Sequence, residues 1–110
     1  MTKEEYLEKH VFNGLANRND GFDQECIKYF AESDFETVLQ RVEHLGIGLF
    51  GIEPWKDRGY YDVRTHEDYG LGSRDPKWFR RAFAEFKERD NDLLYAASYD
   101  IPEHLLGKKE

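Results

Sequence analysis

The sequence contains a single cysteine, Cys26, and no long hydrophobic run. One cysteine excludes a disulfide within the chain and a metal site built from several thiolates. No apolar stretch approaches the roughly 20 residues that a membrane-spanning helix needs. The N-terminal residues MTKEEYLEKH also lack the basic segment and apolar core of a secretory signal. These absences predict a cytoplasmic protein that has no contact with a membrane.

Basic residues are scarce relative to acidic ones. The 110 residues include 16 Lys and Arg against 23 Asp and Glu, which gives a net charge of −7. Residues 1–46 alone carry ten acids and five bases. Binding to nucleic acid requires clustered positive charge that neutralises phosphates. The composition therefore argues against a nucleic-acid partner and favours a basic protein partner.

Apolar residues, in contrast, are frequent enough to build a core. Hydrophobic residues make up 39% of the sequence and aromatic residues 15%, far from the composition of disordered chains. The length is that of one ordinary domain, and no repeat, low-complexity tract or linker divides it. We therefore predict a single domain over residues 1–110.

Two helices are predicted in the first 30 residues. Thr2 and Glu5 have the spacing of a capping box, and apolar residues then recur at helical spacing. This first helix is predicted to fade near Asn13 and Gly14, and a turn signal follows at residues 19–21. After it, apolar residues on one helical stripe predict a second, shorter helix over residues 22–30.

A third helix is predicted to start at Ser33. Ser33 and Glu36 form another possible capping box, and an apolar face follows until Gly46, which is placed to stop the helix. About three helices are therefore expected before the sheet.

The second half of the chain predicts strands around one further helix. The run IGLFGI at residues 47–52 is too short and too rich in glycine for a helix, and it predicts a buried central strand. From Tyr60 the sequence alternates, which predicts a second, half-buried strand. Its inward residues would be Tyr61, Val63 and Thr65, and its outward residues Asp62, Arg64 and His66.

Asp75 and Pro76 supply a cap and a first helical residue for a helix with a strongly apolar stripe that includes Trp78. Residues 93–101 then predict a third strand, on the far side of the first. The order ββαβ predicts an α+β fold with a small, mainly antiparallel three-stranded sheet and helices packed on one face.

The densest polar cluster lies on and after the second strand. Asp62, His66, Glu67 and Asp68 are residue types that can serve as acid, base or metal ligand. Asp62 and His66 lie about 13 Å apart along a strand, however, too far to pair directly. The simpler interpretation is a solvated outer row. Neither a nucleophile motif, a histidine pair with metal spacing nor a phosphate loop in a fitting context is present, so no cofactor or metal site is predicted.

Aromatic recognition is the other candidate. Trp55 falls in a predicted hairpin tip over residues 53–59, near Asp57 and Tyr60. A Trp at a turn either folds back onto its own domain or anchors a partner, and the sequence leaves both possibilities open. Further candidate contacts for a basic partner are the acidic residues Glu32, Asp34 and Glu36.

Three functions are compatible with these features. The first is a non-catalytic module that binds a basic protein; its size and charge are similar to those of small inhibitors such as bacterial immunity proteins against toxin nucleases. The second is a small enzyme that uses the Asp62, His66, Glu67 and Asp68 cluster. The third is an oligomeric protein whose last strand forms the contact, provided that no helix covers it; its contact residues would be Leu93, Tyr95, Tyr99 and Ile101.

Overall fold

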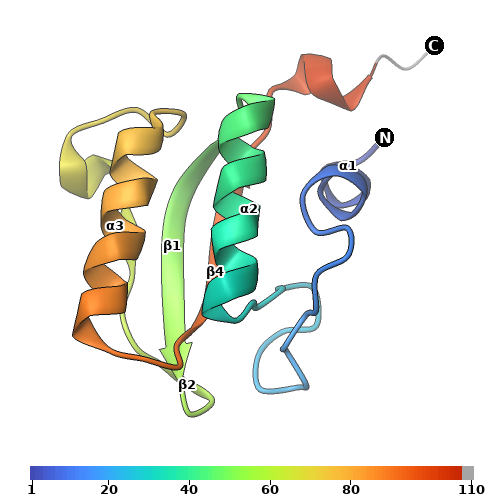
Figure 1. Cartoon of the computed structure of the whole chain (residues 1–110). Helices are drawn as coiled ribbons and strands as arrows, with labels where there is room; N and C mark the ends of the chain where they lie inside the picture. The colour runs from blue at the N-terminus through green and yellow to red at the C-terminus, as the bar shows by residue number, and fades with distance from the viewer. Residues whose placement is uncertain (108–110) are drawn as a thin grey trace.

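The computed structural model describes residues 1–107, which form an α+β fold (Figure 1). None of the α-helices in this part of the chain is long and apolar enough to cross a membrane. The elements follow one another as α1 (Lys3–His10), α2 (Glu32–Leu45), β1 (Gly48–Lys56), β2 (Gly59–Tyr60), β3 (Arg64–Thr65), the 3-10 helix η1 (His66–Tyr69), α3 (Pro76–Arg89), β4 (Leu94–Asp100) and the 3-10 helix η2 (Glu103–Leu106).

Strand β1 lies in the middle of an antiparallel sheet. Along one edge it pairs with β4, from Gly48 opposite Asp100 to Trp55 opposite Leu94. Except for Lys56, its residues that pair with β2 or β3 also have a partner in β4, so β2 and β3 share the other edge. The antiparallel sheet with residues 47–52 at its centre is confirmed, although the sheet has four strands rather than the three predicted.

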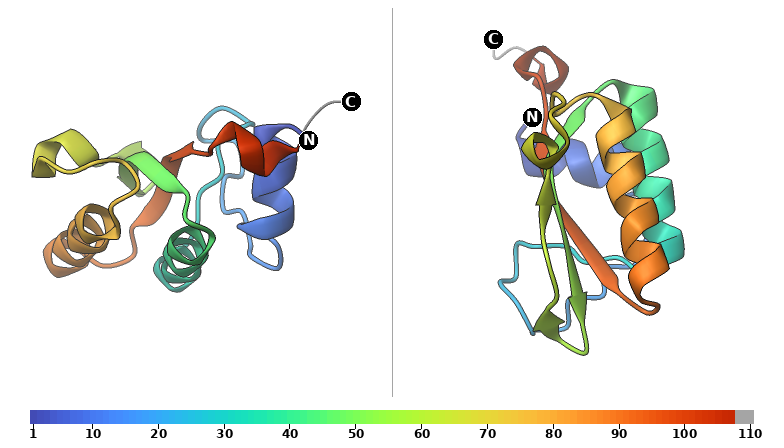
Figure 2. Two further views of the ribbon diagram at one scale, coloured as in Figure 1. Left: turned by 90° about the horizontal axis from the view of Figure 1, so that it is seen from above. Right: turned by 90° about the vertical axis from the view of Figure 1, so that its left-hand side faces the viewer.

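Helices α2 and α3 lie side by side on one face of this sheet (Figure 2). Their apolar stripes form the core together with Ile52 and Tyr95 of the sheet. The Tyr95 ring stacks on Phe35 of α2 at 5.1 Å and meets Phe83 of α3 edge-on at 5.0 Å between ring centroids. The apolar stripe predicted for α3 is confirmed, since Trp78, Phe79, Ala82, Phe83 and Phe86 are all buried.

The predicted helix signals are confirmed at several ends. Thr2 and Glu5 form the capping box of α1, the Asp75 carboxylate accepts a hydrogen bond from the Lys77 amide, and Gly46 ends α2 with φ of 74°. The predicted start at Ser33 is wrong. Helix α2 begins at Glu32 with Ala31 as its N-cap, because the preceding Phe30 already pairs with Tyr95 through its backbone and fixes where the chain turns into the helix.

The helix predicted over residues 22–30 does not exist. This segment has no regular structure apart from the Phe30–Tyr95 bridge, and it is held by two asparagine side chains. Asn19 Nδ2 donates to the carbonyls of Gln24 and Ile27, while Asn17 Oδ1 accepts from the Tyr29 amide. Such side-chain bonds to the backbone compete with the helical pattern, which the apolar spacing alone did not reveal.

The faces predicted for the second strand are partly wrong. Tyr60 pairs with Trp55 and Arg64 with Ile52, so four residue steps on this strand oppose three on β1. The extra residue is a β-bulge, at which the amides of Tyr61 and Asp62 both point to the Pro54 carbonyl. The bulge divides the strand into β2 and β3 and reverses the alternation after it. The side chain of Arg64 therefore faces the helices, and those of Val63 and Thr65 face away.

Gly48 lies where the loop before α3 crosses the first residues of β1. A Cβ atom at this position would lie 2.6 Å from the Ser73 carbonyl oxygen, while the Leu49 amide donates to that same carbonyl at 3.0 Å. We expect Gly48→Ala to lower the free energy of unfolding by about 1–3 kcal/mol, because the backbone on both sides must shift. Urea denaturation measures this change. Gly72→Ala is the matched control, since its Cβ would meet no atom within 4 Å, and an equal effect of both substitutions would contradict the prediction.

Tyr95 buries its hydroxyl without a hydrogen-bond partner among residues 1–107. The Tyr29 hydroxyl, in contrast, donates to Asp23 Oδ2 at 2.6 Å. We expect Tyr95→Phe to leave the free energy of unfolding unchanged or to raise it by up to about 1 kcal/mol, since it removes an unsatisfied polar group. Tyr29→Phe should lower it by about 1 kcal/mol. Urea unfolding of both variants tests the difference, and a clear loss of stability in Tyr95→Phe would count against it.

Candidate functional site

A groove crosses the face of the sheet that α2 and α3 leave open. It has a volume of about 540 Å³ and lies between the strands and the irregular segment around Tyr29. Small residues of the strands line it together with aromatic and acidic side chains: Asp23, Ile27, Tyr29, Phe50, Gly51, Glu53, Trp55, Val63, Thr65, Ala96, Ala97 and Ser98. Two carboxylates and no Lys or Arg belong to this lining, so the groove is both aromatic and negatively charged.

Trp55 lies at one end of this groove, and its position answers the question that the sequence left open. The ring is half-buried and packs against Phe22 and Tyr29, each at 5.4 Å between ring centroids. Because β1 continues to Lys56, Trp55 belongs to the strand and not to the turn. The side chain thus folds back onto its own domain and still contributes surface to the groove.

The turn itself is shorter than predicted. It consists of Asp57 and Arg58, both with positive φ, 53° and 68°, as in the two-residue turns that match the twist of a hairpin. Asp57 is exposed at the tip, and Arg58 pairs with Asp20 at 2.6 Å. Tyr60 is opposite Trp55 in the register and therefore shares its face of the sheet.

Two carboxylates lie beside Tyr29 in the groove. Glu53 Oε2 accepts a hydrogen bond from Trp55 Nε1 at 2.6 Å, and Asp23 Oδ2 accepts one from the Tyr29 hydroxyl at 2.6 Å. Burial raises the pKa of Tyr29, and so do its bond to Asp23 and the negative charges of Asp23 and Glu53. Both carboxylates thus belong to the lining of the groove that contains Tyr29, and both raise the pKa of its hydroxyl.

Large hydrophobic side chains are exposed on the same side of the sheet. Phe50 is 46% exposed, Val63 39% and Tyr60 59%. The pairing of β1 with β4 is irregular between Leu49 and Gly51, and Phe50 lies at that irregularity on the groove side. Together with Trp55, these side chains make an open apolar surface around the two carboxylates. Exposed apolar groups gathered on one face are typical of an interaction site.

The three acidic residues of α2 do not form one surface. Glu36 is engaged by α3, where Arg80 lies 2.9 Å from its carboxylate. The Asp34 carboxylate accepts a hydrogen bond from the Ala16 amide at 3.4 Å. Glu32 alone of the three is exposed without a side-chain contact in the described residues, near Arg18 at the start of the helix.

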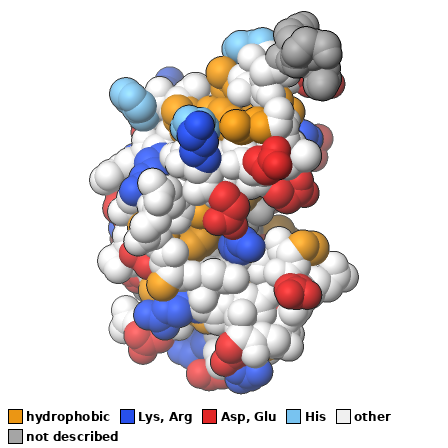
Figure 3. All heavy atoms as spheres, turned by 90° about the vertical axis from the view of Figure 1, so that its right-hand side faces the viewer, with side chains coloured by type: hydrophobic (Ala, Val, Ile, Leu, Met, Phe, Trp, Pro, Cys, Tyr) orange, Lys and Arg blue, Asp and Glu red, His pale blue; other side chains and the backbone are white. Residues whose placement is uncertain are grey.

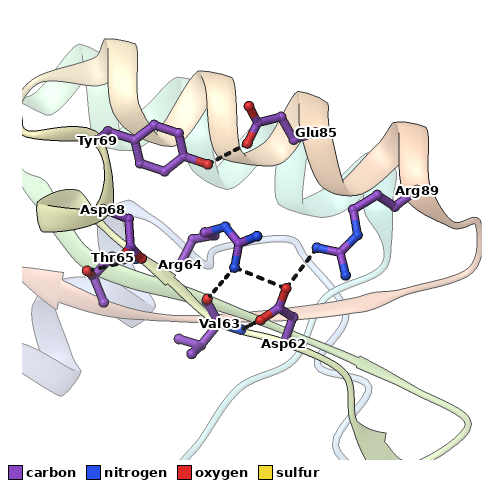
Figure 4. A network of polar contacts seen from close by, with 8 residues as sticks. All are labelled: Asp62, Val63, Arg64, Thr65, Asp68, Tyr69, Glu85 and Arg89. Atoms are coloured by element: carbon purple, nitrogen blue, oxygen red, sulfur yellow. Dashed lines mark hydrogen bonds and ion pairs between the residues drawn. The ribbon is translucent and has the colours of Figure 1, made fainter.

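Asp62 belongs to a network of ion pairs that faces α3 (Figure 4). Its Oδ2 lies 2.8 Å from Arg89 and 3.1 Å from Arg64, and its Oδ1 accepts from the Val63 amide at 2.7 Å. Partial burial alone would raise the pKa of Asp62. The hydrogen bonds from Arg89 and Val63 and the charges of Arg64 and Arg89 outweigh burial, and they hold the pKa below its ordinary value. This carboxylate thus links the residues next to β3 to helix α3.

The other residues of the predicted acid–base cluster point to different contacts. His66 Nδ1 lies 2.7 Å from the Leu71 carbonyl oxygen. Asp68 Oδ2 accepts a hydrogen bond from the Thr65 amide at 2.8 Å (Figure 4). Glu67 is exposed. Within residues 1–107 no three His, Cys, Asp or Glu side chains converge as metal ligands. The structure therefore does not bring Asp62, His66, Glu67 and Asp68 together at one point.

The groove residues Asp23, Tyr29 and Glu53 were not among the predicted candidates. Asp23 and Tyr29 belong to the segment that was predicted to be a helix, so nothing in the sequence placed them near Trp55. Glu53 was assigned to the turn. Its spacing of two from Trp55 would have placed both on one face if the strand had been extended through Pro54.

The amino-acid sequence matches no protein-family model, and neither a curated protein nor a solved structure is significantly similar to this chain.

The lowered pKa of Asp62 predicts a dependence of stability on pH. Because the carboxyl is more acidic in the folded than in the unfolded state, where its pKa is about 3.9, its contribution is present above that pH and is lost as the pH falls further. We expect Asp62→Asn to lower the free energy of unfolding by about 1–2 kcal/mol at neutral pH and by less in acid. Urea denaturation at neutral pH and at pH values below about 3.9 measures the difference.

Glu67→Gln is the matched control, since it removes one exposed negative charge from the neighbouring turn. It should change the stability little at any pH. An Asp62→Asn variant whose stability followed that of the parent protein at every pH would refute the role assigned to this carboxylate.

Proposed function

We propose that the protein is a non-catalytic binding module and that its groove receives a basic segment of a partner protein. One observation carries the proposal. The groove combines exposed aromatic and apolar surface with the carboxylates of Glu53 and Asp23, and its lining contains no basic side chain. A positively charged partner would supply the missing charge and also cover the apolar surface.

The charge of the whole chain supports the same class of partner. A net charge of −7 attracts positively charged proteins at long range and accelerates their encounter. Some carboxylates outside the groove are already in ion pairs, as in Glu36 with Arg80 and Asp62 with Arg89. The carboxylates of the groove lack such ion pairs within the described chain and also lie next to aromatic surface, which makes them the best candidates for contacts with the partner.

The contacts of the alternative acid–base cluster favour binding over catalysis. Asp62 and Asp68 each stabilise local structure, and His66 faces a backbone carbonyl rather than a carboxylate. The surface of β4 that was considered for self-association is also covered. Leu93, Tyr95 and Ile101 are buried, and the half-buried Tyr99 ring meets Phe12 at 5.5 Å.

Affinity capture with defined variants tests the proposal. We expect the immobilised protein to retain a basic protein at low salt and to release it as the salt concentration rises. Calorimetry with the purified partner should then show at least about a tenfold loss of affinity for Glu53→Lys and for Trp55→Ala, since both residues line the groove that is expected to receive the partner. Glu32→Lys tests separately whether the start of α2 takes part.

Glu103→Lys is the matched control, because it makes the same charge change at an exposed position outside the groove. Equal losses of affinity in Glu53→Lys and Glu103→Lys would mean that the affinity depends only on the total charge of the protein. The proposal would be refuted if the immobilised protein retained no basic protein. It would also be refuted if neither Glu53→Lys nor Trp55→Ala changed the affinity for the retained protein.

A further inference from the structure

Arginine side chains repeatedly join an aromatic ring to a carboxylate in this protein. Arg81 lies over the Tyr69 ring at 5.6 Å and pairs with Glu85 at 3.2 Å. Arg89 lies over the Tyr61 ring at 5.1 Å and pairs with Asp62 at 2.8 Å. A guanidinium suits such places because its flat face stacks on the ring while its edge donates to the carboxylate.

Two further arginines are placed in the same way. Arg64 lies over the Phe86 ring at 5.9 Å and pairs with Asp62, and Arg58 lies over the Phe22 ring at 5.5 Å and pairs with Asp20. The arrangement thus occurs four times within residues 1–107, on exposed and on half-buried surface alike.

The groove contains the same combination without the arginine. The Trp55 ring lies beside the Glu53 carboxylate, and the Tyr29 ring beside the Asp23 carboxylate. No cation of the described chain lies over the Trp55 or Tyr29 ring, and none pairs with Glu53 or Asp23. Glu53 Oε2 accepts from Trp55, whereas Glu53 Oε1 accepts no hydrogen bond from residues 1–107.

We infer that an arginine side chain of the partner completes this groove, with its guanidinium against Trp55 and between the carboxylates of Glu53 and Asp23. The floor leaves space for the aliphatic part of such a side chain, because beside Glu53 and Trp55 it consists of the small residues Gly51, Ala96, Ala97 and Ser98 of β1 and β4. The open aromatic surface of Phe50 then contacts the neighbouring residues of the partner. This inference rests on the proposed function and specifies which basic residue the groove recognises.

Arginine suits the groove better than lysine for two reasons. A guanidinium offers five donors in a plane, enough to reach both carboxylates at once, whereas an ammonium group is a compact point charge. It is also less strongly hydrated, so its transfer into a half-buried aromatic groove costs less free energy. Selectivity between the two side chains therefore distinguishes this arrangement from simple charge attraction.

NMR titration with short acetylated Gly/Ser/Ala peptides that carry one central arginine, lysine or citrulline tests the inference. The Trp55 indole N–H reports on the groove, and that of the buried Trp78, which donates to the Ser73 carbonyl, is the internal reference. We expect the arginine peptide to shift the Trp55 signal and to bind at least about threefold more tightly than the lysine peptide. The citrulline peptide, which keeps the shape without the charge, should bind at least about tenfold more weakly than the arginine peptide.

Two variants show whether binding takes place in the groove. Glu53→Gln should weaken binding of the arginine peptide at least about fivefold while it keeps an acceptor for Trp55 Nε1. Ser98→Arg should also weaken binding, since it places an arginine on the floor of the groove from an exposed position. It leaves Glu53 unchanged, so it tests the groove even if Glu53→Gln destabilises the fold.

Several results would overturn the inference. Equal affinity for the arginine and lysine peptides would do so, although a basic partner captured through Glu53 and Trp55 would still stand. No shift of the Trp55 signal up to about 10 mM arginine peptide would also overturn it. Undiminished binding of the arginine peptide by both Glu53→Gln and Ser98→Arg would overturn the inference too. A dimer of the protein alone in which Trp55 is buried would have the same consequence. Failure of the capture experiment would instead refute the proposed function itself.

Discussion

Backbone pairing along both edges of β1 is the constraint on which the other elements depend, and Pro54 lies inside this strand. A proline in a central strand cannot donate to the neighbouring strand. The β-bulge at Tyr61 and Asp62 lies opposite Pro54, and the amides of both residues point to the Pro54 carbonyl. The bulge also directs Asp62 and Arg64 toward α3, where Arg89 pairs with Asp62. The position of one proline thus connects the register of the sheet to its attachment to the helix.

Carboxylates on the two faces of the sheet have different partners. On the side of the helices, carboxylates lie next to arginines, as Glu36 does to Arg80. Asp62 lies next to Arg89 in the same way (Figure 4). On the open side, Glu53 and Asp23 accept hydrogen bonds only from neutral donors of the described chain, which are the Trp55 indole, the Tyr29 hydroxyl and the Gln24 amide. Acidic and basic side chains are mixed with apolar patches on the side of the molecule that Figure 3 presents. The difference in ion pairing between the two faces is therefore due to particular residues and not simply to the net charge.

The parts of the fold that depend on local patterns could be predicted from the sequence. The apolar stripe of α3, its Asp75 cap and the Thr2 capping box each need only a few neighbouring residues, and all are present. The errors arise where distant residues decide the structure. Phe22 and Tyr29 pack on Trp55 from an irregular segment, which spacing alone presents as a helix. The bulge opposite Pro54 reverses the faces to which the following side chains point, in a strand whose sequence alternates regularly. For the same reasons Trp55 could be named as a candidate, whereas its neighbours Glu53 and Asp23 could not.

The two sides of the groove differ in how freely their sequence can change. Its floor is part of the sheet, where a Cβ atom at Gly51 would lie 3.2 Å from the Arg64 carbonyl oxygen and where Ala96 is buried, so larger residues at these two positions press on their neighbours. Its other wall is an irregular segment held mainly by Asn17 and Asn19, and such segments accept substitutions and insertions while the scaffold stays intact. Substitutions along that wall alone would therefore change the shape and charge of the groove, while the sheet and the helices that support it stay the same.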